Sequence, residues 1–131
     1  MTTVLFACVH NAGRSQIAAA FLNALADPAK ARAISAGTHP GERVHPEAVA
    51  AMGEVGIDLG AAKPRRLTEA LAQQAQLLIT MGCGDDCPIV PGLKRVDWAL
   101  SDPKGQRLDQ VRAIRDEIRD RVYALIQEHR W

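Results

Sequence analysis

Short apolar runs alternate along the chain with longer stretches in which apolar residues recur every three or four positions. Turn-forming or polar residues bound each short run, which is typical of strands. These predicted strands cover residues 4–7, 31–37, 76–81 and 93–98. The helically spaced stretches are predicted helices and cover residues 14–26, 46–55, 67–74 and 109–128.

The same spacing predicts which helix residues face the core. In the first helix these are Ile17, Ala20, Phe21, Ala24 and Leu25. In the second they are Val49, Met52 and Val55, and Gly56 follows as a C-terminal cap. In the last they are Val111, Ile114, Ile118, Val122 and Leu125. The arginines of the last helix are interpreted as a solvated face.

Strands that alternate with helices predict an α/β fold, in which helices cover both faces of a parallel sheet. The chain has 131 residues with no repeat and no interdomain linker, so we expect residues 1–131 to form a single domain. Ligands of such folds bind at the carboxyl ends of the strands. Cys8 closes the first predicted strand, Cys83 follows the third and Asp102 follows the fourth. The functional site is therefore predicted at this edge of the sheet.

The stretch between the first strand and the first helix has the composition of an anion-binding turn. Unpaired N–H groups collect at a helix N-terminus, where the helix dipole is positive. Gly13 allows a positive φ and Asn11 tolerates it, so these N–H groups can curl inward. Arg14 can grip two oxygens of a tetrahedral anion, and Ser15 can donate to a Cys8 thiolate that the arginine and the dipole favour. The predicted oxyanion-binding residues are Val9, His10, Asn11, Ala12, Gly13, Arg14 and Ser15.

Composition and charge exclude several function classes. The formal net charge is +1, which leaves no broad basic face for nucleic acid or anionic lipid. No apolar run approaches the roughly 20 residues of a membrane span, and the first residues do not resemble a signal peptide. We therefore expect a cytoplasmic protein. Its three cysteines, an odd number, favour a metal site or redox chemistry over a disulfide framework.

Two simpler interpretations of the cysteines compete with redox chemistry. Cys8 can be a small buried apolar residue at the end of a strand. Alternatively, Cys8, His10, Cys83 and Cys87 supply the residue types of a Cys3His zinc site. Cys8 and His10 make a poor chelating pair on an extended segment, and Arg14 would repel a cation. We therefore predict no metal.

Five motifs follow one another along the chain. They are "CVHNAGRSQ" (8–16), "SAGT" (35–38), "TMGCGDDCP" (80–88), "DWALSDPKG" (97–105) and "IRDEI" (114–118). Together they resemble the low-molecular-weight protein tyrosine phosphatase family, and most of all the arsenate reductases that share its fold. The resemblance implies a three-layer sandwich around a four-stranded parallel sheet in the order 2-1-3-4. It also implies that Cys8 is the nucleophile, Arg14 the oxyanion clamp and Asp102 the general acid, which Pro103 helps to orient.

Two features favour a reductase over a phosphatase. The phosphatases of this family carry aromatic residues after the Asp-Pro pair, whereas Lys104-Gly105 follows here. Hydrolysis needs no further thiol, whereas reduction of arsenate to arsenite needs two electrons, which a dithiol can supply. A phosphatase acting on phosphate monoesters, and an oxyanion or arsenite sensor without turnover, are the alternatives.

The second thiol is the point on which related reductases differ. If the first and third strands are neighbours about 4.8 Å apart, Cys83 lies within reach of Cys8. The resemblance then implies that Cys83 attacks Cys8 and that Cys87 attacks Cys83, or that a small-molecule thiol acts in their place. Only three residues separate Cys83 from Cys87, so a bridge between them would close a tight loop.

The resemblance also bears on partners. It implies no bound cofactor, but an external reductant: thioredoxin, or mycothiol or glutathione together with a glutaredoxin-like protein. We expect phosphate and sulfate to mimic arsenate, and the protein to be a monomer that binds neither nucleic acid nor membrane. His10 is interpreted equally as tuning the bound anion or as facing solvent, and Trp98 as a packing residue.

Overall fold

The structure, a computed structural model, describes residues 1–82, 90–101 and 105–131. Four parallel strands form a sheet in the order β2-β1-β3-β4. The strands are β1 Thr2–Cys8, β2 Ala31–Gly37, β3 Leu77–Thr80 and β4 Lys94–Asp97. The helices are α1 Arg14–Leu25, α2 Pro46–Gly53, α3 Glu69–Gln73 and α4 Leu108–His129. The predicted α/β fold and strand order are confirmed.

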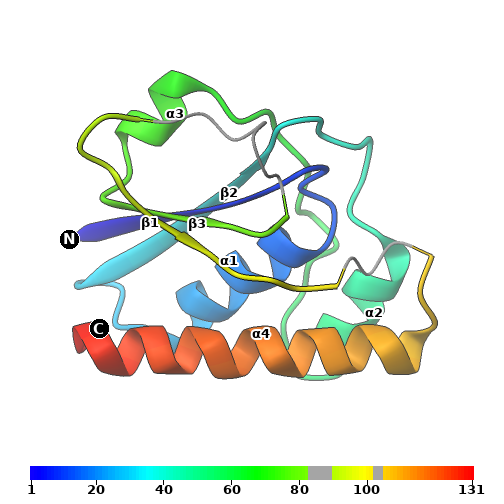
Figure 1. The fold of residues 1–131 in the computed structure, drawn as a ribbon. Helices are drawn as coiled ribbons and strands as arrows, with labels where there is room; N and C mark the ends of the chain where they lie inside the picture. The colour runs from blue at the N-terminus through cyan, green and yellow to red at the C-terminus, as the bar shows by residue number, and fades with distance from the viewer. Residues whose placement is uncertain (83–89, 102–104) are drawn as a thin grey trace.

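Helices cover both faces of the sheet. Helices α1 and α4 lie on one face and α3 lies on the other, as Figure 1 shows. Residues of β1 alternate between the two layers, because successive side chains of a strand point to opposite faces. Val4, Phe6 and Cys8 belong to the core under α1 and α4, whereas Leu5 and Ala7 belong to the smaller core under α3. The predicted three-layer arrangement is thus confirmed, and Cys8 is on the side of α1.

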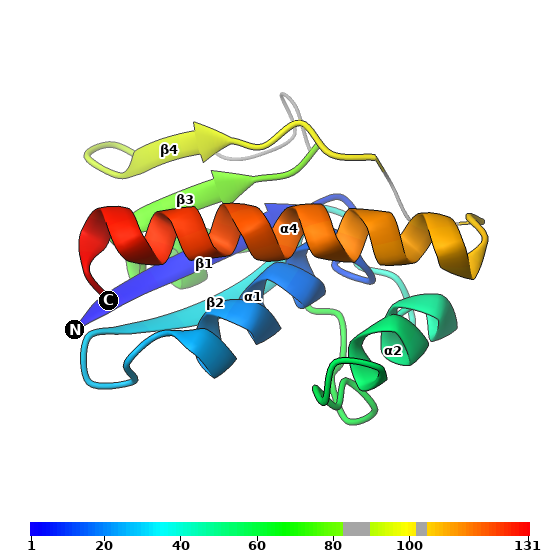
Figure 2. The same ribbon diagram turned by 90° about the horizontal axis from the view of Figure 1, so that it is seen from below.

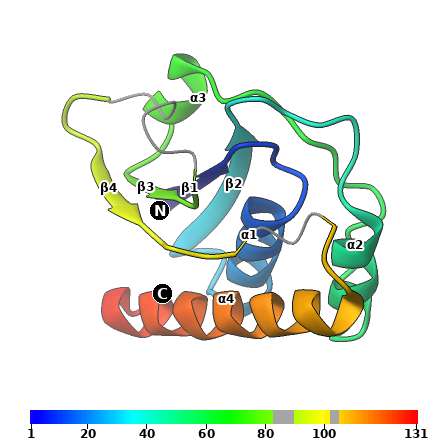
Figure 3. The same cartoon turned by 45° about the vertical axis from the view of Figure 1, so that its right-hand side comes forward.

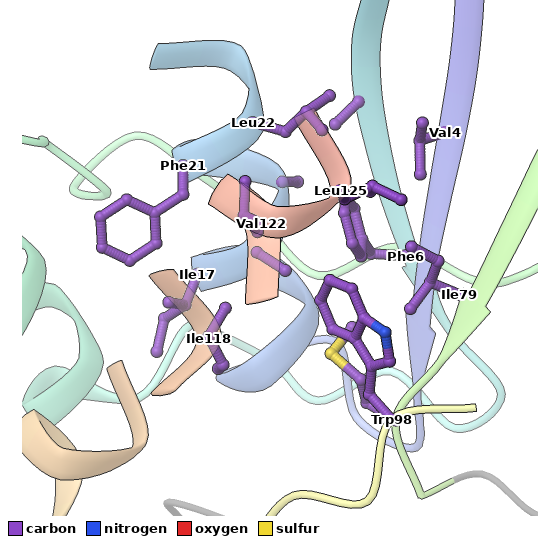
Figure 4. Close-up of a cluster of buried hydrophobic side chains, with 14 of the residues drawn as sticks. Val4, Phe6, Ile17, Phe21, Leu22, Ile79, Trp98, Ile118, Val122 and Leu125 are labelled. Carbon is purple, nitrogen blue, oxygen red and sulfur yellow. The ribbon is translucent and has the colours of Figure 1, made fainter. Parts of the chain in front are cut away.

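The larger core joins the sheet to α1 and α4 (Figure 4). Phe6 and Trp98 pack with their ring centroids 5.7 Å apart, so the predicted packing role of Trp98 is confirmed. The labelled aliphatic residues come from both helices and from the strands: Val4, Ile17, Leu22, Ile79, Ile118, Val122 and Leu125. These contacts fix α1 against the sheet, and with it the segment that enters α1.

The predicted core faces of α1 and α2 are partly wrong. In α1 the buried stripe passes through Ala18 and Leu22 to Ala26 just past the helix, so Ala24 and Leu25 fall beside it and are exposed. Helix α2 ends at Gly53, so Val55 lies in the following turn, where helical spacing no longer applies, and it is exposed too. Gly56 does adopt a left-handed conformation in that turn, with a φ of 82°.

One arginine of α4 contradicts the prediction of a solvated face. Figure 2 shows α2 beside the first turns of α4. Arg115 is buried, and its Nη1 atom donates to the Ala51 carbonyl at 2.8 Å and to Glu54 at 2.9 Å. Arg112 binds the same carboxylate at 2.6 Å. The hydrogen bond from Arg112, with that from Arg115, lowers the pKa of Glu54 to about 2. Glu54 thus ties the end of α2 to α4.

We expect Glu54→Gln to lower the melting temperature at pH 7. The folded-state pKa of about 2 lies below the usual 4.5, so the carboxylate stabilises the fold fully above about pH 4.5. That contribution is lost as the pH falls from 4.5 towards 2, and the two proteins should then converge. Thermal unfolding of both proteins from pH 7 to pH 2 measures this.

The matched control is Glu117→Gln. Glu117 pairs with Arg121 across one turn of α4 at 3.4 Å, the kind of exposed pair that contributes little. Its replacement should therefore shift the melting temperature less. Equal shifts for the two variants at pH 7 would contradict the role given to Glu54.

Candidate active site

The segment between β1 and α1 curls at the carboxyl ends of the strands. Cys8 is the last residue of β1 and only 2% exposed, and Arg14 is the first residue of α1. The segment that follows β2 runs beside this loop in Figure 3. Residues 8–15, called the 8–15 loop below, therefore lie at the edge where the strand pattern predicts a ligand site.

Hydrogen bonds from the segment after β2 fix the orientation of the loop backbone. Four of its N–H groups donate to loop carbonyls over 2.7 to 3.2 Å: Thr38 to Cys8, His39 to Val9, Gly41 to His10 and His45 to Ala12. In a trans peptide the N–H points opposite to the C=O. The N–H groups that follow these carbonyls therefore point away from the segment after β2; they belong to Val9, His10, Asn11 and Gly13. This orientation leaves the four N–H groups available to a ligand, and their convergence on a bound anion stays a prediction of the sequence.

The left-handed residue of the loop is Asn11, with a φ of 50°. A positive φ at Gly13 was the other expectation, and it is wrong: the φ of Gly13 is −146° with a ψ of −90°. This pair of angles lies outside the regions open to residues with a Cβ, so a glycine is still needed there. The sharp change of direction into α1 thus uses Asn11 and Gly13 together.

Side chains of the loop converge on the Cys8 sulfur. Asn11 Nδ2 donates to Ser15 Oγ at 2.7 Å, and Ser15 Oγ lies 2.9 Å from Cys8 Sγ. An amide nitrogen only donates, so the Ser15 oxygen accepts from Asn11. A Cys8 thiolate has no hydrogen to give, so in the thiolate state Ser15 is the donor of the bond to sulfur.

A second layer of hydrogen bonds holds the Asn11 amide in this orientation. Its Oδ1 atom accepts from the Arg65 backbone N–H at 3.0 Å and from Gln16 Nε2 at 3.1 Å. The same Gln16 nitrogen lies 3.1 Å from the Asn11 carbonyl and 3.2 Å from the Lys63 carbonyl. Because two donors face Oδ1, the amide nitrogen must face Ser15. Sequence reasoning missed Gln16, because its contact with Asn11 depends on how the loop curls and its contact with Lys63 joins residues 47 positions apart.

We expect Gln16→Met to lower the free energy of unfolding by about 1–3 kcal/mol. Methionine keeps a similar shape but donates no hydrogen bond, so it leaves buried carbonyls without their donor. Gln16 is 7% exposed, so water does not readily replace it. Urea denaturation measures the change. The control is Gln73→Met on α3, an exposed position where the change should be within about 0.5 kcal/mol; a loss there as large as at Gln16 would contradict the prediction.

Arg14 carries a positive charge near the end of the 8–15 loop, at the first residue of α1. It is only 7% exposed, and its Nη1 atom donates to the Leu100 carbonyl at 3.4 Å. Leu100 lies beyond β4 and Arg14 beside β1, so this contact connects the exits of two strands. The structure therefore brings the predicted clamp and the Cys8 sulfur together at one strand edge.

His10 is turned towards the segment after β2. Its Nδ1 atom lies 3.0 Å from the His39 carbonyl, and since a carbonyl only accepts, Nδ1 carries the proton there. This contact braces the loop from outside, so the histidine has a structural partner that neither of the two interpretations anticipated.

Three predicted site residues, Cys83, Cys87 and Asp102, lie outside the described residues. The chain leads towards the first two from β3, the neighbour of β1, with Ala7 and Thr80 as register partners. Within residues 1–82, 90–101 and 105–131, no group of three or more His, Cys, Asp or Glu side chains could hold a metal ion.

Comparison with known proteins connects this arrangement to a family. The family model described as low molecular weight phosphotyrosine protein phosphatase matches residues 3–130. The chain is similar to a Halobacterium salinarum protein named "Putative arsenate reductase", at 40% identity over 129 residues, covering 94% of this chain and 89% of that protein. It is 36% identical over 129 residues to the "Glutaredoxin arsenate reductase" of Synechocystis, covering 96% and 97% of the two chains.

A solved structure is similar as well. The thioredoxin-dependent arsenate reductase of Corynebacterium glutamicum superposes with a TM-score of 0.83 at 37% sequence identity. The match covers 99% of this chain and 62% of that one, so this chain spans less than two thirds of that protein.

Proposed function

We propose that this chain, which belongs to the low molecular weight phosphotyrosine protein phosphatase family, is an enzyme that reduces arsenate to arsenite. The observation that carries the proposal is the placement of the Cys8 sulfur beside Ser15, in a loop whose carbonyls are held by the segment after β2 and that leads into Arg14 at the start of α1. Relatives named as arsenate reductases, similar over nearly the whole chain, support this chemistry over other uses of the same loop.

Arsenate is proposed to bind within the 8–15 loop. Its negatively charged oxygens would accept hydrogen bonds from the loop N–H groups and from the start of α1, where the helix dipole is positive. The Arg14 fork would hold two of these oxygens. Such preorganised donors stabilise an anion without rearranging. Phosphate and sulfate have the same tetrahedral shape and are expected to compete.

The proposed reaction begins at the Cys8 sulfur. The thiolate, to which Ser15 donates, attacks arsenic, and an As–O bond breaks as Asp102 protonates the departing oxygen to water. A second thiolate then attacks the Cys8 sulfur, the S–As bond breaks and its electron pair stays on arsenic. Arsenic thereby changes from As(V) to As(III), and two thiols become one disulfide.

The second thiol is proposed to be Cys83, with Cys87 receiving the disulfide afterwards, or a small-molecule thiol. In either case an external thiol must reduce the disulfide between turnovers. One relative is named for glutaredoxin and another is thioredoxin-dependent, which supports an external thiol reductant for this chain. Thioredoxin, and mycothiol or glutathione with a glutaredoxin-like protein, are the candidates.

The second candidate function is hydrolysis of phosphate monoesters, which the family description favours. It would use Cys8, Arg14 and Asp102 in the same roles and would leave Cys83 and Cys87 unused. The two functions therefore differ in whether thiols are consumed.

A single-turnover experiment separates these candidates. The fully reduced protein is freed of reductant, mixed with arsenate, and assayed for arsenite per subunit, and its disulfides are mapped by mass spectrometry. One equivalent of arsenite with a Cys8–Cys83 or Cys83–Cys87 bridge supports the internal route. Arsenite that forms only after a small-molecule thiol is added supports the external route. No arsenite in either case, with hydrolysis of an aryl phosphate, would overturn the reductase proposal.

No helix in the part of the chain that the structure describes is both long enough and apolar enough to cross a membrane. The proposed chemistry starts from reduced thiols, which persist in a reducing compartment. On this redox requirement we propose that the protein works in the cytoplasm. We also propose that it is a monomer that binds neither nucleic acid nor membrane. Size-exclusion chromatography with light scattering tests the monomer.

A further inference from the structure

The turn after β3 lies against the Arg14 guanidinium. Gly82 has a φ of 84°, and a Cβ atom at this residue would lie 2.6 Å from Arg14 Nη1 and 3.5 Å from Arg14 Cζ. We infer that Gly82 is a positioning residue for oxyanion binding, because the absence of a side chain there leaves the space that the guanidinium occupies. The inference rests on the proposed role of Arg14 in holding the oxyanion.

The backbone on both sides of this contact is held in place. Met81 N donates to the Ala7 carbonyl at 2.7 Å, which ties the exit of β3 to β1. Ile17 N donates to the Gly13 carbonyl at 2.9 Å, which anchors the first turn of α1. A methyl group at position 82 would therefore push on the part that can move, the end of the long Arg14 side chain.

The displaced guanidinium is the group proposed to hold the anion. Its Nη1 atom also donates to the Leu100 carbonyl at 3.4 Å, already a long bond, so a shift of the guanidinium would disturb this contact as well. A fork that holds two oxygens depends on geometry, so a shift of about 1 Å weakens both bonds at once. The expected consequence of Gly82→Ala is thus a loss of anion affinity in a protein that remains folded.

Gly92 is a matched control. It has nearly the same backbone conformation, with a φ of 81°, but a Cβ atom there would have nothing within 4 Å. Gly92→Ala therefore carries the same backbone cost of a left-handed alanine and lacks the contact with Arg14. The difference between the two variants isolates the steric effect on the guanidinium.

The test measures how well phosphate protects Cys8 from alkylation by iodoacetamide, with the Cys8 peptide followed by mass spectrometry. Gly82→Ala should raise the phosphate concentration for half-protection by about tenfold or more, the loss expected when a charged hydrogen bond is broken. Gly92→Ala should change it by less than about twofold. Both variants should lose a similar amount of thermal stability. In arsenate turnover, Gly82→Ala should raise KM by a larger factor than it lowers kcat.

The same substitution in an Arg14→Ala background separates positioning from a general structural effect. There the methyl group has no guanidinium to displace, so Gly82→Ala should alter phosphate protection by less than about twofold. If phosphate protects Cys8 in the single Gly82→Ala variant as well as in the wild type, the inference is overturned. It is also overturned if Gly82→Ala weakens phosphate protection in the Arg14→Ala background as much as it does in the wild-type background. Because protection involves no turnover, a protein that binds phosphate but reduces no arsenate would refute the proposed function and leave this inference standing.

Discussion

Replacing Cys8 with serine should lower arsenate reduction by about 10⁴-fold or more, the order of loss seen when a catalytic nucleophile is removed. A serine hydroxyl is not ionised at neutral pH, so the attack on arsenic is lost. It also cannot form a disulfide, so the electrons for reduction are lost as well. Arsenite formed per subunit, measured in a single turnover, is the direct readout.

The Cys8→Ser variant should nevertheless bind phosphate within a few-fold of the wild-type affinity. Its side chain is close in size to cysteine and sits at a 2% exposed position, and the loop N–H groups and Arg14 are unchanged. Isothermal titration with phosphate checks that the binding loop is intact. Measurable arsenite from a folded, phosphate-binding Cys8→Ser protein would remove Cys8 from the reaction.

Arg14→Lys should lower kcat/KM for arsenate by about 10²–10³-fold, the loss expected when one preorganised oxyanion donor is removed. Lysine keeps the charge, but it is a point charge on a flexible stem and cannot hold two oxygens in one plane. The lysine ammonium group also reaches less far than the guanidinium, so the hydrogen bond to the Leu100 carbonyl is lost. Steady-state kinetics with a saturating reductant measure the change.

Arg32→Lys is the control for this substitution. Arg32 lies on β2 opposite Thr3 of β1, at the end of the sheet away from the 8–15 loop. Its Nε atom donates to the Thr3 hydroxyl at 3.1 Å, so it has a structural contact of its own. The Arg32→Lys variant should therefore keep kcat/KM for arsenate within about twofold of the wild-type value. A loss of less than about threefold for Arg14→Lys would show that the clamp is another residue.

Most of the fold could be predicted from the sequence, because its elements leave strong local patterns. The run before Cys8 is apolar throughout, as a strand buried on both faces must be, and α4 shows its inner stripe from Val111 to Leu125. The errors occurred where the pattern is short. Val55 continues the helical spacing of α2, but the helix ends at Gly53, two residues before it. Nothing in the local sequence distinguishes a helix that ends at Gly53 from one that continues through Val55.

The sequence by itself determined the elements of the proposed reactive centre: a cysteine at the end of a strand, a turn that can curl and an arginine at the start of a helix. These residues are neighbours in the chain, so local geometry brings them together in any fold of this class. Only the tertiary structure decided what supports them. Gln16 and Arg65 orient Asn11, Gly82 makes room for Arg14, and Glu54 pairs with buried Arg115. The contacts of Arg65, Gly82 and Glu54 join segments 54 or more residues apart, and such pairs are set by how the packed layers meet.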